Sequence, residues 1–411
     1  MRKKIFLSKL INKEKKRQEK SINLIASENI TSRRIMKENG NILTNKYAEG
    51  LPGKRYYGGC KIIDIIESIS IEYVKKIFNA SWANVQPHSG SQANAAVMLA
   101  ILKPGDKILG FNLSHGGHLT HGSSVNFSGK LYHSYSYKVS EKTKLIDYKE
   151  VEKIAKREKP KLIICGASSY TRDWDYKKFK KIANDIGSFL MADISHTSGF
   201  ILNRLLNNPI NYCDFITSTT QKTLRGPRGG IILMGKDSIY KNKKISEIID
   251  KGVFPGTQGG PLENTISAKA ISFKDTLNKK YSNYVINTKI NASEISKSLI
   301  KKKYNIITNG TDNHIILIDL KNKKINGKVA EDSLAKADII VNKNMIPFDS
   351  NPPNITSGIR IGTSSITSQG MKKENMNKIA ELIDEVIVNH KNKKIIKKVK
   401  KKVNEFMKKF K

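Results

Sequence analysis

Between residues 61 and 235, helix-like and strand-like hydrophobic patterns alternate along the chain. Apolar residues have the spacing of a helix in three segments: 62–78, 93–102 and 175–187. Short, nearly continuous apolar runs typical of buried strands occur in five: 107–111, 161–166, 189–195, 214–220 and 229–234. Strands that alternate with helices indicate βαβ units, and hence a largely parallel sheet covered on both faces.

The pattern changes after about residue 275. A Lys- and Asn-rich helical stretch leads into apolar runs at 315–320, 339–342 and 358–363, followed by two basic helices. We therefore predict an N-terminal arm (1–24), a large α/β domain (25–275) and a smaller C-terminal α+β domain (276–411).

A further short strand is predicted at 82–86, and polar clusters follow it and three of the other predicted strands of the large domain. They are HSGSQ (88–92), ASSY (167–170), DISH (193–196) and TTQK (219–222). In open α/β sheets, ligands bind beyond the carboxyl ends of the strands. The sequence therefore predicts a binding site where these loops converge, without identifying the ligand.

Lys222 lies at the end of a strand and precedes a turn-forming run, GPRGG (226–230). A lysine held there can act as a Schiff-base nucleophile if its amine is partly deprotonated. The alternative is a lysine that only ends the strand.

Asp193 ends an apolar run and is expected to project into the same crevice. A lone Asp there is also typical of a metal ligand or a helix cap; with a Schiff-base lysine nearby, it fits the partner of a pyridinium nitrogen. His196 would lie near the same ring, or only on a helix face. Ser89 and Ser91, before a helix, predict an anion site, although many such turns bind nothing.

The composition narrows the possible functions. The formal charge of +38 suggests nucleic-acid binding as one function. However, only 11 of the 74 basic residues are arginine, and the lysines are scattered. This favours compositional drift over a nucleic-acid surface. Three widely spaced cysteines predict neither a disulfide framework nor a metal site. With no signal-peptide pattern or membrane-length apolar run, we expect a cytoplasmic protein.

Ten segments, in order along the chain, closely resemble the serine hydroxymethyltransferase family. They are LIASENITS, NKYAEGLPGKRYYGGC, ANVQPHSGSQANAAV, LSHGGHLTHGSSVNFSGKLY, DISHTSG, TTQKTLRGPRGG, VFPGTQGGPL, GTDNHIILIDL, VNKN and TSGIRIGT. The resemblance implies the pyridoxal-phosphate-dependent transferase fold of the aspartate aminotransferase type. It also implies reversible conversion of serine and tetrahydrofolate into glycine and 5,10-methylenetetrahydrofolate, by a homodimer or a tetramer of dimers with shared sites.

The resemblance assigns roles residue by residue. Lys222 would hold pyridoxal phosphate covalently, Asp193 would face the ring nitrogen, and His118 would stack on the ring. The other implied cofactor contacts are Ser89, Gly90, Ser91, Ser168, His196, Thr219, Tyr47, Gly259 and Gly260, the last three reaching across the dimer. Glu49 would transfer a proton at the hydroxymethyl group.

The implied substrate contacts form a second set. Ser27 and Arg360 would bind the amino-acid carboxylate, which a guanidinium meets with two parallel hydrogen bonds. Tyr57, with Tyr56, would reach the site from the neighbouring subunit. The implied folate positions are Leu113, Gly117, His118, Leu119, Asn344, Pro352, Pro353 and Asn354. The resemblance gives no role to His121, which we interpret as structural.

Two other functions remain open at this point. A folate-independent aldolase of the same fold, such as a threonine aldolase, would share Lys222 and Asp193, but the folate loop and YAEG argue against it. A basic RNA-binding protein on a decayed enzyme scaffold is disfavoured because Lys222, Asp193 and Arg360 are all present.

The chain departs from the family pattern at Gln221, where the family normally has His before the lysine. Glutamine keeps its hydrogen-bonding capacity but cannot be protonated. We therefore predict that Gln221→His strengthens cofactor binding or narrows reaction specificity. Cofactor affinity and the rates of serine and threonine cleavage measure this, and constants that all stay unchanged would contradict it.

Overall fold

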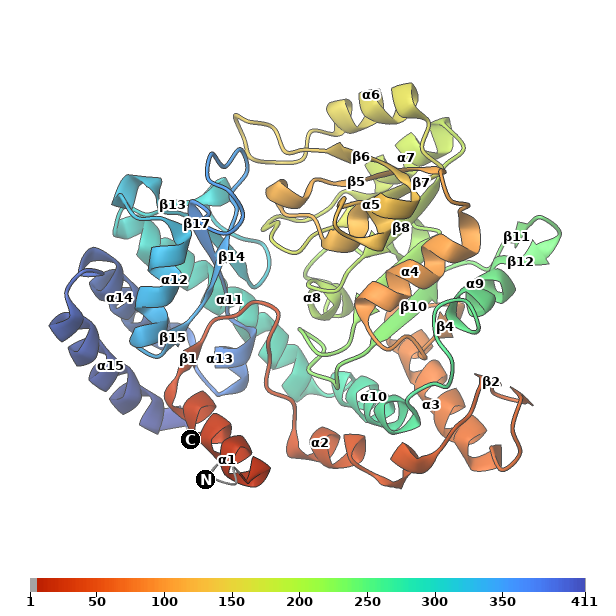
Figure 1. Ribbon diagram of the computed structural model, residues 1–411, viewed down its shortest axis with the longest axis horizontal. Coiled ribbons are helices and arrows are strands. Elements are labelled where there is room, and N and C mark those ends of the chain that lie inside the picture. Colours follow the sequence, from red (N-terminus) through yellow and green to blue (C-terminus); the bar gives the residue numbers. More distant parts are fainter. Residues whose placement is uncertain (1–5, 411) are drawn as a thin grey trace, which may run out of the picture. The chain divides into compact units, whose positions relative to one another are not determined.

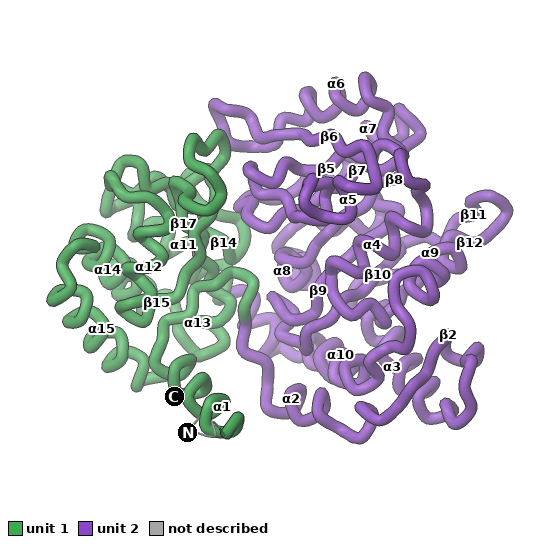
Figure 2. Tube along the Cα trace, in the orientation of Figure 1, with its two compact units in different colours: residues 1–28, 287–411 green, residues 29–286 purple. Residues whose placement is uncertain are grey.

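The computed structural model describes residues 6–410 (Figure 1). The chain forms two compact units, Asn29–Ile286 and a second made of Met1–Glu28 with Asn287–Lys411 (Figure 2). The sequence placed its boundaries at residues 24 and 275, whereas these units divide after residues 28 and 286. The first five residues of the predicted arm lie outside the described residues.

A seven-stranded sheet is the centre of the 29–286 unit. Its order is β4 (Trp82–Asn84), β10 (Gly230–Met234), β9 (Phe215–Thr219), β8 (Phe189–Asp193), β7 (Leu162–Gly166), β5 (Lys107–Phe111) and β6 (His133–Tyr137). Strands β9, β8, β7, β5 and β6 run parallel, and β10 pairs antiparallel with both β9 and β4. Strand β4 therefore runs in the same direction as β9, and its carboxyl end lies at the same edge of the sheet as those of the five parallel strands.

Two apolar clusters cover the two faces of this sheet. Along β7, Leu162 and Ile164 belong to one cluster, and Ile163 and Cys165 to the other. Successive side chains of a strand point to opposite faces of the sheet. Because both faces are buried here, nearly every position of the strand is apolar, as the continuous apolar runs of the sequence indicated. The helices of this unit are α2 (Arg33–Asn39), α3 (Lys61–Phe78), α4 (Gly90–Ile101), α5 (Phe127–Leu131), α6 (Tyr148–Glu158), α7 (Tyr176–Asp185), α8 (Ser198–Leu202), α9 (Ile245–Val253) and α10 (Glu263–Thr276).

Two short hairpins complete the larger unit. Their strands are β2 (Gly50–Leu51), β3 (Lys54–Arg55), β11 (Ile239–Tyr240) and β12 (Lys243–Lys244). The chain leaves this unit within helix α11 (Lys279–Lys301).

The second unit has its own sheet and core. An antiparallel sheet has the order β13 (Asn305–Ile306), β14 (Ile315–Asp319), β17 (Gly358–Gly362) and β16 (Asn342–Asn344), and β1 (Ile22–Asn23) pairs in parallel with β15 (Ile339–Ile340). Its helices are α1 (Leu7–Lys20), α12 (Gly327–Lys336), α13 (Ser364–Ser368), α14 (Lys373–Val388) and α15 (Lys393–Met407).

Helix α15 shows how a lysine-rich segment remains part of a fold. Ile396, Val399, Val403 and Met407 are buried in the core of this unit, while most lysines of the helix are exposed. Its charge therefore lies on the outer face of an ordinary amphipathic helix. Within residues 6–410, no helix combines the length and hydrophobicity needed to cross a bilayer. The predicted mixed α/β architecture is confirmed.

Candidate functional site

Four loops meet at the carboxyl edge of the seven-stranded sheet, as the sequence predicted. Strands β8 and β9 pair in register with Asp193 opposite Thr217, so the segments that follow them run side by side. Thr219 N–H donates to Ser195 Oγ over 3.2 Å, and Thr223 Oγ1 donates to the His196 carbonyl over 3.4 Å. The Asp193 and Lys222 loops therefore form one wall.

Asp193 is the central charged group of this wall. Asn94 Nδ2 donates to its Oδ2 over 2.9 Å, and His121 Nε2 lies 3.2 Å from the same oxygen. Its Oδ1 accepts from Ser195 N–H over 3.1 Å and from Ser195 Oγ over 2.6 Å. Asn94 is itself held by Thr217 Oγ1, which donates to Asn94 Oδ1 over 2.6 Å.

These contacts decide the charge state of the carboxyl group. Burial raises the pKa of Asp193, but the hydrogen bond and proximity of His121, with further contributions from His118 and Ser195, outweigh it and hold the pKa well below the usual range. Asp193 is therefore an ionised carboxylate in the protein interior.

His121 was interpreted as structural from sequence, and the structure gives it a contact with the site. The ligand atoms of His118, His121 and Asp193 lie within 4.8 Å of one another, close enough for a metal ion. The same atoms already have hydrogen-bond partners, since His118 Nδ1 lies 2.8 Å from Thr120 Oγ1 and His121 Nε2 contacts Asp193. Hydrogen bonding thus accounts for the cluster without an ion.

The start of helix α4 lies at this edge, where the sequence predicts an anion site. Ser89 is its N-cap, with Oγ accepting from Gln92 N–H over 3.2 Å. A Cβ on Gly90 would lie 2.6 Å from Thr219 Cγ2, so only glycine lets this helix approach the end of β9 so closely. Ser91 is exposed. Free N–H groups at a helix start favour an anion such as a phosphate.

Lys222 is buried, with 9% of its surface exposed. Its carbonyl accepts from Asn29 Nδ2 over 2.7 Å and from Arg225 N–H over 3.2 Å. Arg225 has a positive φ of 59° and its guanidinium lies 4.7 Å from the Tyr284 ring centroid. The loop is therefore fixed on its outer side as well as by β9.

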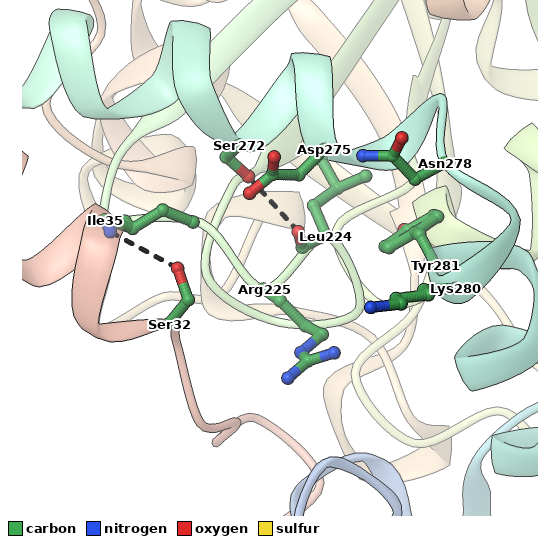
Figure 3. A pocket seen from close by; sticks show the side chains of 9 residues that line it. All are labelled: Ser32, Ile35, Leu224, Arg225, Ser272, Asp275, Asn278, Lys280 and Tyr281. Atoms are coloured by element: carbon green, nitrogen blue, oxygen red, sulfur yellow. Dashed lines mark hydrogen bonds between the residues drawn. The ribbon is translucent and has the colours of Figure 1, made fainter.

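A cavity of about 280 Å³ lies on that outer side (Figure 3). Leu224 and Arg225 form one wall, and Ser272 of α10 another; Ser272 Oγ donates to the Leu224 carbonyl over 3.2 Å. The cavity thus borders the loop that follows Lys222.

Gln221, where the sequence departs from the family pattern, has an unsatisfied group. Its Oε1 is buried and has no hydrogen-bond partner among the described residues. A buried carbonyl without a partner costs free energy, which makes it a natural acceptor for a bound group.

A second polar cluster lies in the same unit. Tyr47 Oη lies 3.3 Å from Glu49 Oε1, and the Tyr47 and Tyr57 rings meet edge to face at 5.6 Å. Cβ atoms on Gly259 and Gly260 would lie 3.1 Å from Glu49 Oε1 and from the Tyr47 ring, respectively. The charge of Glu49, with a hydrogen bond, raises the pKa of Tyr57. The structure therefore groups these five predicted residues within one chain.

Arg360 and Ser27 belong to the other unit. Arg360 lies in the middle of β17, paired with Leu317 and Asn342, and its Nε donates to Asn342 Oδ1 over 3.1 Å. Burial lowers its pKa to about 10, so it remains a cation at neutral pH. The segment before Ser27 packs on the end of the same strand, where Gly362 N–H donates to the Leu24 carbonyl over 2.8 Å.

The remaining predicted positions lie on loops, in short turns or at the end of a strand. Leu113 and Leu119 are partly exposed in short 3₁₀ turns on either side of Gly117, and Ser168 N–H donates to the Gly116 carbonyl over 2.7 Å. His196 is buried after β8. Asn344 ends β16, and the last three positions, Pro352, Pro353 and Asn354, are exposed.

Comparison with protein families identifies the chain. The model of the serine hydroxymethyltransferase family matches residues 3–383 of the 411. The chain therefore belongs to the serine hydroxymethyltransferase family, as its motifs indicated, and the hydroxymethyltransferase function is supported across nearly its whole length. The family implies pyridoxal phosphate as cofactor and tetrahydrofolate as co-substrate. The ionised Asp193, the enclosed Lys222 and the α4 anion site fit such a cofactor.

The charge state of Asp193 gives a direct prediction. Because its folded pKa is depressed, we expect it to stay ionised below about pH 3.9, where a free Asp takes a proton. It therefore stabilises the fold above that pH and loses this contribution as the pH falls through the folded pKa. A carboxyl-carbon NMR titration measures it. His121→Ala should move the midpoint upward; a midpoint at or above the free value in the unsubstituted protein would contradict the assignment.

Proposed function

We propose that this chain is a glycine hydroxymethyltransferase whose cofactor is attached covalently at Lys222. Two observations support the proposal together: the family match along residues 3–383, and the ionised Asp193 beside the Lys222 loop at the sheet edge. Pyridoxal phosphate, when bound, supplies an electron-poor ring that accepts electrons from the substrate Cα. The remaining work is done by residues of the chain.

Three parts of the edge would hold the cofactor. Asp193 would keep the ring nitrogen protonated, since an ionised carboxylate favours the cation beside it. His118 would lie on the ring face, with Nδ1 held by Thr120. The start of α4, with Ser89 and Thr219, would bind the phosphate. Ser91, Ser168 and His196 complete the proposed contacts from the same unit.

Substrate binding is assigned to residues of the second unit. Arg360 would bind the serine carboxylate through two parallel hydrogen bonds and so orient Cα, with Ser27 adding a hydroxyl donor. A carboxylate is a strong partner for Arg360 because burial leaves this cation poorly solvated. By resemblance to the family, the proposed folate positions are Asn344, the loop at 352–354, Leu113, Gly117 and Leu119.

Glu49 is proposed as the group that transfers a proton at the substrate hydroxymethyl oxygen. Its contacts with Tyr47 and Tyr57 fix the position of its carboxyl group. General acid–base work needs such positioning before it needs a suitable pKa.

We also propose that the enzyme is a homodimer with shared sites. Helix α3 exposes Ile62, Ile65 and Ile69 on one face, 66%, 56% and 45% accessible, and Tyr56 nearby is 75% exposed. Such an apolar face in a single chain is typical of an interface. Tyr47, Glu49, Tyr57, Gly259 and Gly260 would then serve the site of the partner subunit.

The covalent attachment predicts a spectroscopic signature. The purified protein supplied with pyridoxal phosphate should absorb visible light, and Lys222→Ala should lose the absorbance of the lysine-linked cofactor. The matched control is Lys274→Ala, which replaces an exposed lysine.

Serine cleavage should depend on tetrahydrofolate. Cleavage at an equal rate without tetrahydrofolate would favour a folate-independent aldolase instead.

Shared sites predict complementation between inactive variants. Lys222→Ala and Tyr57→Ala chains, unfolded and refolded together, should form hybrid dimers in which one of the two sites is intact. Activity should then rise to roughly a quarter of the unsubstituted value, since about half the dimers are hybrids. A mixture no more active than the separate variants would contradict a shared site.

A further inference from the structure

Lys269, in helix α10, is an enclosed ammonium group beneath the loops of the site. Its surface is 1% exposed, and its Nζ donates to the carbonyl oxygens of Val85 over 2.6 Å, Gly230 over 2.9 Å and Pro87 over 3.1 Å. The three carbonyls can accept all three N–H bonds of an ammonium. A neutral amine would turn its lone pair toward one of them, so this arrangement favours the charged form.

The three acceptors belong to the segments that form the anion-binding part of the site. Val85 and Pro87 lie between β4 and Ser89, the N-cap of α4. Gly230 begins β10, and its N–H donates to the Pro87 carbonyl over 2.8 Å. A single nitrogen atom thus joins the end of β4, the turn into α4 and the start of β10.

The Lys222 loop rests on the same face of α10. A Cβ on Gly229 would lie 2.3 Å from Lys269 Cε, so a side chain there would displace the lysine. One turn further along the helix, Ser272 Oγ holds the Leu224 carbonyl (Figure 3). Helix α10 therefore supports both the phosphate turn and the loop that carries Lys222.

Charges on neighbouring elements balance this buried cation. Burial lowers the pKa of Lys269 to about 7, and the carboxyl groups of Glu67 and Glu263 act in the opposite direction. Burial raises the pKa of Glu263 to about 8, with Glu67 adding to the rise. Arg55 Nη2 lies 2.6 Å from Glu67 Oε2, and Arg55 Nε lies 2.8 Å from Asp64 Oδ1. Arg55 and the nearby carboxyl groups thus form one buried charged cluster around Lys269.

We propose that Lys269 is a positioning residue, which holds the start of α4 in place relative to Lys222 and thereby determines affinity for the cofactor phosphate. The proposal rests on the proposed function, since the phosphate is that of pyridoxal phosphate. Lys269 itself touches main-chain carbonyls and acts on the cofactor through the turn that they form.

Lys269→Met tests this, because methionine keeps an unbranched chain and removes the three donors. The dissociation constants of pyridoxal phosphate and of pyridoxal, which lacks the phosphate, are measured on the full chain after cofactor removal. We expect affinity for pyridoxal phosphate to fall about tenfold or more, and affinity for pyridoxal to change little. Lys274→Met, an exposed lysine of the same helix, should leave both unchanged.

The possible outcomes separate this inference from the proposed function. Equal losses for both compounds, or no loss, would overturn the role of Lys269 in phosphate binding. An unsubstituted protein that binds neither compound would overturn the proposed function and this inference with it. If Lys269→Met fails to fold, Gly229→Ala displaces the ammonium without removing it. It should weaken pyridoxal phosphate selectively, and an unchanged ratio of the two constants would overturn the inference.

Discussion

A carboxylate that stays charged in the protein interior is the interaction on which the candidate site depends. Taking an ion such as Asp193 out of water costs several kcal/mol unless hydrogen bonds and opposite charge replace the lost solvent. His121, Asn94 and Ser195 supply those contacts from three different segments of the chain. Asp193 therefore stays ionised only while these three segments hold their positions. The negative charge that they stabilise would attract a cationic ring.

A second group of buried charges lies next to the turn into α4 and the start of β10. Lys269 donates to carbonyls of the segment between β4 and α4 and of the first residue of β10, while Arg55 pairs with Asp64 and Glu67 of α3. Buried ion pairs contribute little net stability compared with apolar packing, but removing one partner leaves a costly isolated charge. We infer that this network favours one arrangement of the turn whose backbone N–H groups would meet a phosphate.

Much of the fold followed from the sequence because its signals are local. A strand buried on both faces must be apolar throughout, and β7, β8 and β9 were found on that basis. Lys222 and Asp193 were identified because they follow such strands. Lys269 and His121 were missed because their partners are distant in sequence, with Val85 separated from Lys269 by 184 residues. No local pattern distinguishes a lysine that meets three carbonyls from one on a solvated helix face. Arg360 was identified only through its resemblance to the family motif, since nothing else in the sequence of its strand indicates a carboxylate-binding residue.

Covalent attachment of pyridoxal phosphate to Lys222, and to no other lysine, is the central proposal. Peptide mapping tests it most directly. The protein is loaded with pyridoxal phosphate and treated with borohydride, which makes the linkage between an aldehyde and a lysine amine permanent. Mass spectrometry of its peptides then locates the label. We expect the label on Lys222 at close to one per chain. Label spread over exposed lysines, or none on Lys222, would contradict it.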